Sequence, residues 1–142
     1  MSDSQRFPVA AHALAHLALL GATTPERAIS SAELAASVPT NPVVVRRVTA
    51  MLAQAGLIAT RTGASGGAWL VRDPAEIRLD EVLRAVHGCT RLGAAPPGVK
   101  GCPVGERIPS AVRAAITAAD AAAAGRLAEI SVADLVKAPE IA

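Results

Sequence analysis

Apolar residues recur at intervals of three and four over several stretches of the chain, which is the spacing of one face of an α-helix. The first repeat runs from Phe7 to Ala18 and predicts a helix over residues 6–20. A later repeat, from Leu79 to Val86, predicts another helix that ends near residue 88. Each helix has one apolar side, so we expect both to pack into a common core.

Two helix start signals stand close together between these stretches. Ser30 opens a Ser-x-x-Glu capping box, which predicts a short helix that Pro39 ends. Asn41 followed by Pro42 is a second start signal, because Asn caps helices well and Pro fits the first helical position. This second helix runs to about residue 55. Two helices joined by a short turn are the outline of a helix-turn-helix.

The second helix of this pair is predicted to be amphipathic. Its core face consists of Val44, Val48, Met51, Leu52 and Ala55. Its outward face consists of Val43, Arg47, Ala50 and Gln54. Arg46 lies at the border, so both arginines point away from the core. An outward basic face suits a phosphate backbone, and the alternative is an ordinary solvated helix pair.

The charge distribution supports the first of these interpretations. No Asp or Glu occurs from Leu34 to Arg72, and that window holds Arg46, Arg47, Arg61 and Arg72. If all four arginines met phosphates in each of two copies, the log–log salt dependence of binding would have a slope of about −7. The net charge of +2 is too small to indicate nucleic-acid binding by itself.

A hairpin is predicted directly after the helix pair. Residues 57–62 and 68–72 have the composition of two strands, and the glycine-rich residues 63–67 form the turn between them. A hairpin in this position is the wing of a winged helix. Its tip carries little side-chain bulk and can therefore approach a phosphate backbone closely.

The last third of the chain combines a loop and a long helix. The Gly- and Pro-rich segment between Cys89 and Cys102 predicts a loop, and an Ala-rich helix is expected from Ser110 to Leu127. Its small side chains suit packing against a twin helix, although it could also be a core helix within one chain. We therefore expect a DNA-binding domain over residues 1–88, a Cys-containing sensor loop over 89–109, and a dimerisation region over 110–142.

Composition excludes several classes of protein. The 142 residues are 51 % hydrophobic but only 1 % aromatic, which favours a mainly α-helical protein of one domain. Two cysteines are too few for a disulfide scaffold, and the apolar stretch over residues 9–22 is too short to span a bilayer. We expect a cytoplasmic protein with reduced thiols and no membrane partner. The chain has no phosphate loop, catalytic triad or metal-spaced cluster, so we do not expect an enzyme.

The order of these parts resembles the Rrf-two family of bacterial winged-helix transcriptional regulators, which includes IscR, NsrR and CymR. The matching segments are "SAELAASVPTNPVVVRRVTAMLAQAGLI", "GASGGAWLVRDPAEIRLDEVLRAV" and the terminal "ISVADLV". The segment "GCPVGERI" is most similar to the YwnA-type, thiol-responsive branch. The resemblance implies a mainly α fold with a two-stranded wing, in a homodimer that binds a palindromic operator on double-stranded DNA, most simply as a repressor.

The resemblance also implies which residues would contact DNA. They are Ser31, Thr40, Asn41, Val43, Arg46, Arg47, Arg61, Ser65 and Gly66. Thr62 departs from the family pattern, because many members carry a basic residue directly before the first wing glycine. No metal-binding residue is expected.

Cys89 and Cys102 are the candidate redox switch. Pro103 after Cys102 predicts that the sulfur lies at a helix N-terminus, where the helix dipole favours the thiolate, although Pro109 suggests that this helical turn is short. The alternative is two structural thiols. Family members with an iron–sulfur cluster usually present three cysteines here, so a cluster in this chain would need another ligand, such as His12. We expect no cofactor, and the remaining alternatives are a small-ligand sensor and a winged-helix module that binds protein.

Overall fold

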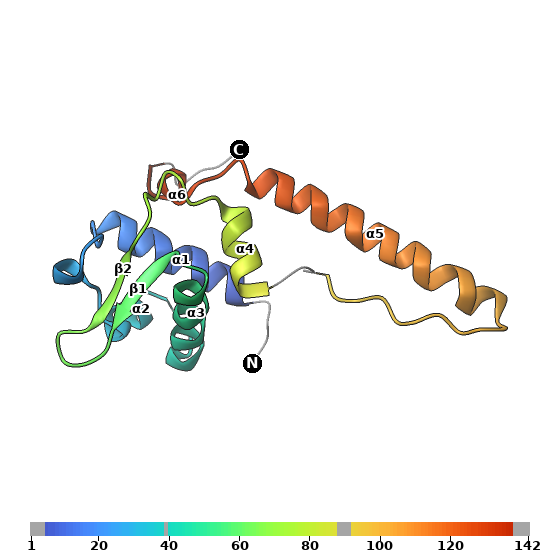
Figure 1. The fold of residues 1–142 in the computed structure, drawn as a ribbon, viewed down its shortest axis with the longest axis horizontal. Helices are drawn as coiled ribbons and strands as arrows, with labels where there is room; N and C mark the ends of the chain where they lie inside the picture. Colours follow the sequence, from blue (N-terminus) through green and yellow to red (C-terminus); the bar gives the residue numbers. More distant parts are fainter. Residues whose placement is uncertain (1–4, 39, 88–91, 138–142) are drawn as a thin grey trace.

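Helices dominate the fold, and a computed structural model describes residues 5–38, 40–87 and 92–137. The elements follow one another around a globular body, from which one helix projects (Figure 1). Their bounds are α1 Arg6–Leu19, the 3₁₀ turn η2 Pro25–Arg27, α2 Ser31–Ser37, α3 Pro42–Gln54, β1 Ile58–Arg61, β2 Gly67–Leu70, α4 Leu79–His87, α5 Pro103–Leu127 and α6 Val132–Lys137. The chain is thus a winged helix-turn-helix with a long C-terminal helix, as the sequence predicts.

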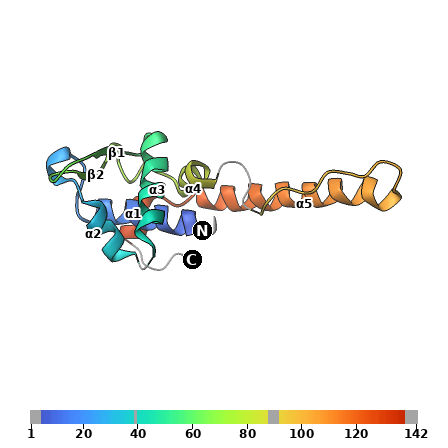
Figure 2. The same cartoon turned by 90° about the horizontal axis from the view of Figure 1, so that it is seen from below.

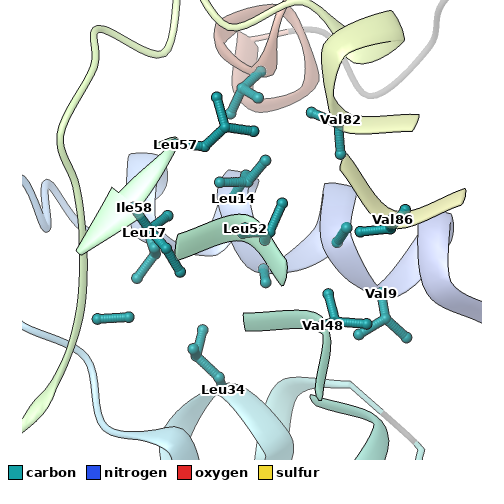
Figure 3. Packing of buried hydrophobic residues seen from close by; sticks show 14 of the residues in the cluster. Val9, Leu14, Leu17, Leu34, Val48, Leu52, Leu57, Ile58, Val82 and Val86 are labelled. Carbon is teal, nitrogen blue, oxygen red and sulfur yellow. The ribbon is translucent and has the colours of Figure 1, made fainter. Parts of the chain in front are cut away.

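Helix α1 lies at the centre of the core. Helices α3, α4 and α6 all pack against it, and buried aliphatic side chains fill the space between them. Figure 3 shows Leu14 and Leu17 of α1 among Leu52, Val82 and other apolar side chains of the surrounding elements. The structure buries the apolar face predicted for α4. On α1 it buries Ala10, Leu14 and Leu17 of the predicted repeat, and Val9 and Ala13 as well.

The capping signals of the helix-turn-helix are confirmed. The Ser30 hydroxyl accepts a hydrogen bond from the Glu33 N–H at 3.2 Å and starts α2. The Asn41 side-chain oxygen accepts from the Val43 N–H at 2.9 Å and starts α3. Val38 has the extended backbone that a following proline imposes. Pro39, which we expected to end α2, lies outside the described residues.

Helix α3 buries a face slightly different from the predicted one. Val44, Val48 and Leu52 are buried as expected, and Val45 is buried as well. Ala55 is exposed, so its predicted place on the core face is wrong. The reason is that α3 ends at Gln54, and the chain turns away to β1 before another turn of helix can pack.

The wing is a two-stranded antiparallel hairpin whose second strand is hydrogen-bonded to the body. Ile58 pairs with Leu70 and Arg61 pairs with Gly67. Ala68 also exchanges two backbone hydrogen bonds with Ile29, of 2.9 and 2.8 Å, just before α2. A β-carbon at Gly67 would collide with the Ile29 carbonyl, so this strand approaches the body closely only with glycine there.

Helix α5 begins at Pro103, seven residues before the predicted start at Ser110, and it continues through Pro109 without a break. A proline inside a helix leaves the carbonyl four residues earlier without its usual partner. Here that carbonyl belongs to Gly105, and it accepts a hydrogen bond from the Val99 N–H at 2.9 Å. The loop before the helix thus replaces the bond that Pro109 removes.

Helix α5 projects from the body, and none of its 25 residues is buried (Figures 1 and 2). At 1.5 Å per residue it is about 37 Å long. Residues 92–102 run out to its tip, where the chain turns back into the helix. The returning chain rejoins the body through hydrogen bonds of 2.9 Å from the Leu79 N–H to Ile130 and from the Val132 N–H to Ile77.

No helix among the described residues combines the length and the low polarity that crossing a membrane requires.

An ion pair links the chain after the wing to α4. The Arg72 guanidinium donates to Glu81 at 2.9 Å and to the Glu76 carbonyl at 3.1 Å. The hydrogen bond from Arg72 lowers the pKa of the Glu81 carboxyl below its ordinary value. Because that pKa is lowered in the folded state, the pair stabilises the fold above the unfolded pKa of Glu81. This stability is lost as the pH falls through the lower folded pKa.

We expect Glu81→Gln to lower the unfolding temperature at pH 7 by about 1–3 °C, since the pair is partly exposed and its contribution is modest. The difference from the parent chain should shrink as the pH falls below about 4 and should vanish once the pH is below the lowered folded pKa of Glu81, where both chains carry a neutral side chain. Thermal unfolding followed by circular dichroism measures it. Glu26→Gln, an exposed carboxylate outside this pair, is the control. If the unfolding temperatures of the Glu81→Gln and parent chains differed equally at pH 7 and pH 3, the ion pair would not be the cause of the difference.

Candidate nucleic-acid interface

The exposed side of α3 carries the two arginines that the sequence singles out. Arg46 and Arg47 are exposed, and so is Val43 one turn earlier. Within the described part of the chain, neither guanidinium has a carboxylate partner. This side of α3 therefore presents two unneutralised positive charges to solvent, in line with the predicted outward face.

A hollow of about 460 Å³ lies between α3, the start of α2 and the wing. Residues from all three elements line it. They are Ile29, Ser30, Ser31, Leu34, Arg46, Thr49, Ala50, Thr60, Arg61, Thr62, Gly63, Ala64, Gly66, Gly67 and Ala68. No carboxylate is among them, so the lining adds to a surface that suits phosphate groups.

Arg61 holds the wing in shape. Its guanidinium donates to the Ser65 carbonyl at 3.2 Å and to the Pro25 carbonyl at 3.4 Å. Gly66 completes the turn, because a β-carbon there would collide with the Arg61 carbonyl. Arg61 thus links the wing tip to η2, and its charge lies beside the exposed Ser65.

The other predicted contact residues differ in whether their side chains are already engaged within the chain. Ser31 is exposed at the first position of α2. Thr40 is half-buried in the turn, and its hydroxyl donates to the Gln5 side chain at 3.2 Å. Asn41 uses its side-chain oxygen to cap α3. Thr40 and Asn41 therefore use their side chains to position the turn and the start of α3.

The residues predicted from the sequence omit part of this surface, and the predicted salt dependence counts one arginine that is paired. Thr49, Thr60 and Thr62 line the hollow, although none of them was predicted. The sequence offered a signal for Thr49 alone, which lies three residues after Arg46 and therefore on the same side of the helix. Arg72, one of the four arginines counted for the salt slope, is paired with Glu81. The salt slope of about −7 therefore counts charges that are not free.

Cys102 caps α5, as the sequence predicts. It is exposed, and its sulfur accepts a hydrogen bond from the Gly105 N–H at 3.4 Å. Cys89, the other candidate switch residue, lies outside the described residues. The helix after Cys102 is not a short turn but the start of the whole of α5.

A single chain cannot hold an iron–sulfur cluster by four thiolates, because its sequence has two cysteines in total. In addition, no three His, Cys, Asp or Glu side chains of the described residues gather as a metal site. His12, considered above as a substitute ligand, lies exposed on α1 beside Ser37.

A short helix, a tight turn, an exposed basic helix and a wing together define a winged-helix DNA-binding protein. The chain belongs to the Rrf2 family, because that family's model, "Iron-dependent Transcriptional regulator", matches residues 3–138. It is therefore a DNA-binding transcriptional regulator and not an enzyme.

Individual relatives agree with this assignment. The chain is 36 % identical over 135 residues to the "Putative HTH-type transcriptional regulator YwnA" of Bacillus subtilis, covering 94 % of this chain and 96 % of that protein. A crystal structure of a "putative DNA binding protein" is 37 % identical, with a TM-score of 0.68 over 92 % of this chain and 97 % of that one. The B. subtilis cysteine regulator CymR, at 19 % identity, shares the fold with a TM-score of 0.62 over 93 % of each chain.

Replacing Arg46 and Arg47 together by alanine should weaken binding to a duplex from the protein's own promoter and leave the fold intact, because both side chains are exposed. If both meet phosphates, the log–log salt slope should become shallower by about 1.8 per bound chain. Fluorescence anisotropy at several salt concentrations measures this. The control is the Arg107→Ala, Arg113→Ala pair on α5, which removes the same charge elsewhere. Equal affinities and slopes for the parent and the α3 variant would show that α3 does not face DNA.

Proposed function

We propose that the protein is a homodimeric transcriptional regulator that binds a palindromic operator, acts as a repressor, and changes its operator affinity when Cys102 is oxidised. The observation that supports this most is α5, a helix of 25 residues with no buried side chain. A long helix whose side chains all stay unburied within its own chain is expected to gain stability from a second copy. The proposal needs no cofactor and places the protein in the cytoplasm.

One side of α5 suits such a contact. Its residues are spaced by three and four, as in the seam of a coiled coil, and all are exposed: Val104, Ile108, Val112, Ala115, Ala119 and Ala122. Val104 and Ile108 are more than half exposed, which is costly for large aliphatic side chains in a free monomer. Small alanines in the second half allow two helices to approach closely. We therefore take this side as the dimer contact.

A dimer built on α5 would give operator binding its symmetry. A two-fold axis presents two copies of α3, and two recognition helices read two half-sites about one helical turn of DNA apart. The wings would then lie beside each half-site. Repression would follow where such an operator overlaps a promoter, since a bound dimer occupies the DNA that polymerase needs.

Ala115→Asp should yield monomers and abolish tight operator binding, because it places a charge in the middle of the proposed contact. Ala121→Asp is the matched control, since the same change lies on another side of α5 where Ala121 is also exposed. Sedimentation velocity gives the oligomeric state, and anisotropy gives the affinity. A dimeric Ala115→Asp variant, or two variants that behave alike, would contradict the proposed contact.

Cys102 is the residue that could couple oxidation to this contact. Its sulfur caps the helix that bears the dimer seam, two residues before Val104. With hydrogen peroxide as oxidant, the two thiols of Cys89 and Cys102 would lose two protons and two electrons, and peroxide would become two waters. The disulfide would take the Cys102 sulfur out of its capping position and thereby alter the start of α5.

Cys102→Ser should remove the response of operator affinity to peroxide and leave the reduced affinity unchanged. Serine is itself a good N-cap, so this change keeps the start of α5 and removes only the thiol chemistry. Cys89→Ser should give the same result if Cys89 is the partner. The measurement is anisotropy before and after mild peroxide, with mass spectrometry of the cysteine peptides. A Cys102→Ser variant that responds like the parent would refute the switch.

A further inference from the structure

Two histidines on α1 converge on one point of the surface. His12 and His16 are four residues apart, which places them on the same side of the helix one turn from each other. The Nε2 atom of His12 lies 3.0 Å from the Ser37 hydroxyl oxygen, and the Nδ1 atom of His16 lies 2.8 Å from the same oxygen. Two imidazole nitrogens thus approach a single position that a hydroxyl occupies.

The hydrogen positions at this point follow from counting donors. The Ser37 hydroxyl donates its one hydrogen to the Leu34 carbonyl at 3.0 Å. Its oxygen can therefore only accept from the two rings, so both facing nitrogens carry the hydrogen. A neutral imidazole can move that hydrogen to its other nitrogen and expose a lone pair in its place. The two rings would then offer two lone pairs toward one position.

The surroundings leave room for an ion and its waters. The histidines lie at an open hollow of about 340 Å³, and His12 itself is exposed. The other lining residues are Ala15, Leu19, Leu20, Ser37, Leu135 and Val136. None of the lining side chains is a carboxylate, so the two neutral imidazoles are the strong ligands. Imidazole ligands favour zinc, copper and nickel over magnesium and calcium.

We propose that His12 and His16 form a binding site for a divalent transition-metal ion of the zinc class. Two histidines at this spacing on one side of a helix are a recurring pair of zinc ligands. Water completes the coordination, because no further strong ligand lines this hollow among the described residues. This ligand set is separate from Cys89, Cys102 and the surface of α3.

The ion and Ser37 compete for the same two nitrogens. A bound ion takes the lone pairs, and a nitrogen that binds metal cannot donate a hydrogen bond to the Ser37 hydroxyl. Ser37 is the last residue of α2, directly before the turn that leads to α3. Metal binding therefore releases the end of α2 from α1, and removing the Ser37 hydroxyl favours the metal-bound state.

Isothermal titration of the untagged full-length chain with zinc tests this site. The parent for the test carries Cys89→Ser and Cys102→Ser, so that thiols do not bind the metal. It should take up one zinc ion per chain with a dissociation constant below about 1 mM. His12→Gln and His16→Gln should each weaken binding at least about tenfold. His87→Gln, the remaining histidine, should bind like the parent. Ser37→Ala should bind zinc several-fold more tightly.

The outcomes test the metal site and the competition with Ser37 separately. A parent chain without zinc binding in this range, or His12→Gln and His16→Gln chains that bind like the parent, would overturn the site. Weaker binding by Ser37→Ala would overturn the competition, because it would make Ser37 a ligand. Circular dichroism of each variant verifies the fold. Zinc should also raise the unfolding temperature of the Ser37→Ala chain but not that of the Ser37→Ala, His16→Gln double variant, which would support the site independently.

Discussion

The packing of α3 against α1 determines how this protein can meet DNA. Val48 and Leu52 of α3 are fully buried in the core around α1, which fixes the rotation of α3 about its own axis. Arg46 and Arg47 must then face solvent, since an unpaired charge is strongly disfavoured in such a core. The wing is held to the same core through Ala68 and Ile29. Burial of a few aliphatic side chains thus sets the geometry of the basic surface.

The second structural constraint is the start of α5. Proline inside a helix normally ends or bends it, but the loop backbone at Val99 satisfies the Gly105 carbonyl that Pro109 leaves free. Cys102 caps the same helical turn with its sulfur. The start of the long helix therefore depends on one loop, and the proposed thiol switch acts on a position that already has a structural role.

Much of the fold could be predicted because its signals are local. The caps at Ser30 and Asn41, and the glycine-rich turn of the wing, act within a few residues of their own positions. The continuation of α5 through Pro109 could not be predicted, because it depends on Val99 folding back onto the helix. The role of Arg61 in the wing and the convergence of His12 and His16 on Ser37 depend equally on contacts that only the folded chain brings together.

The most direct test of the α3 surface is the amide NMR spectrum of ¹⁵N-labelled protein titrated with a duplex from its own promoter. We expect the largest shift changes on residues 43–47 of α3 and 63–66 of the wing. Residues 132–137 of α6, which packs against α1, should change least. Specific binding of the duplex with changes confined to α5 or α6, and none on α3, would contradict the account.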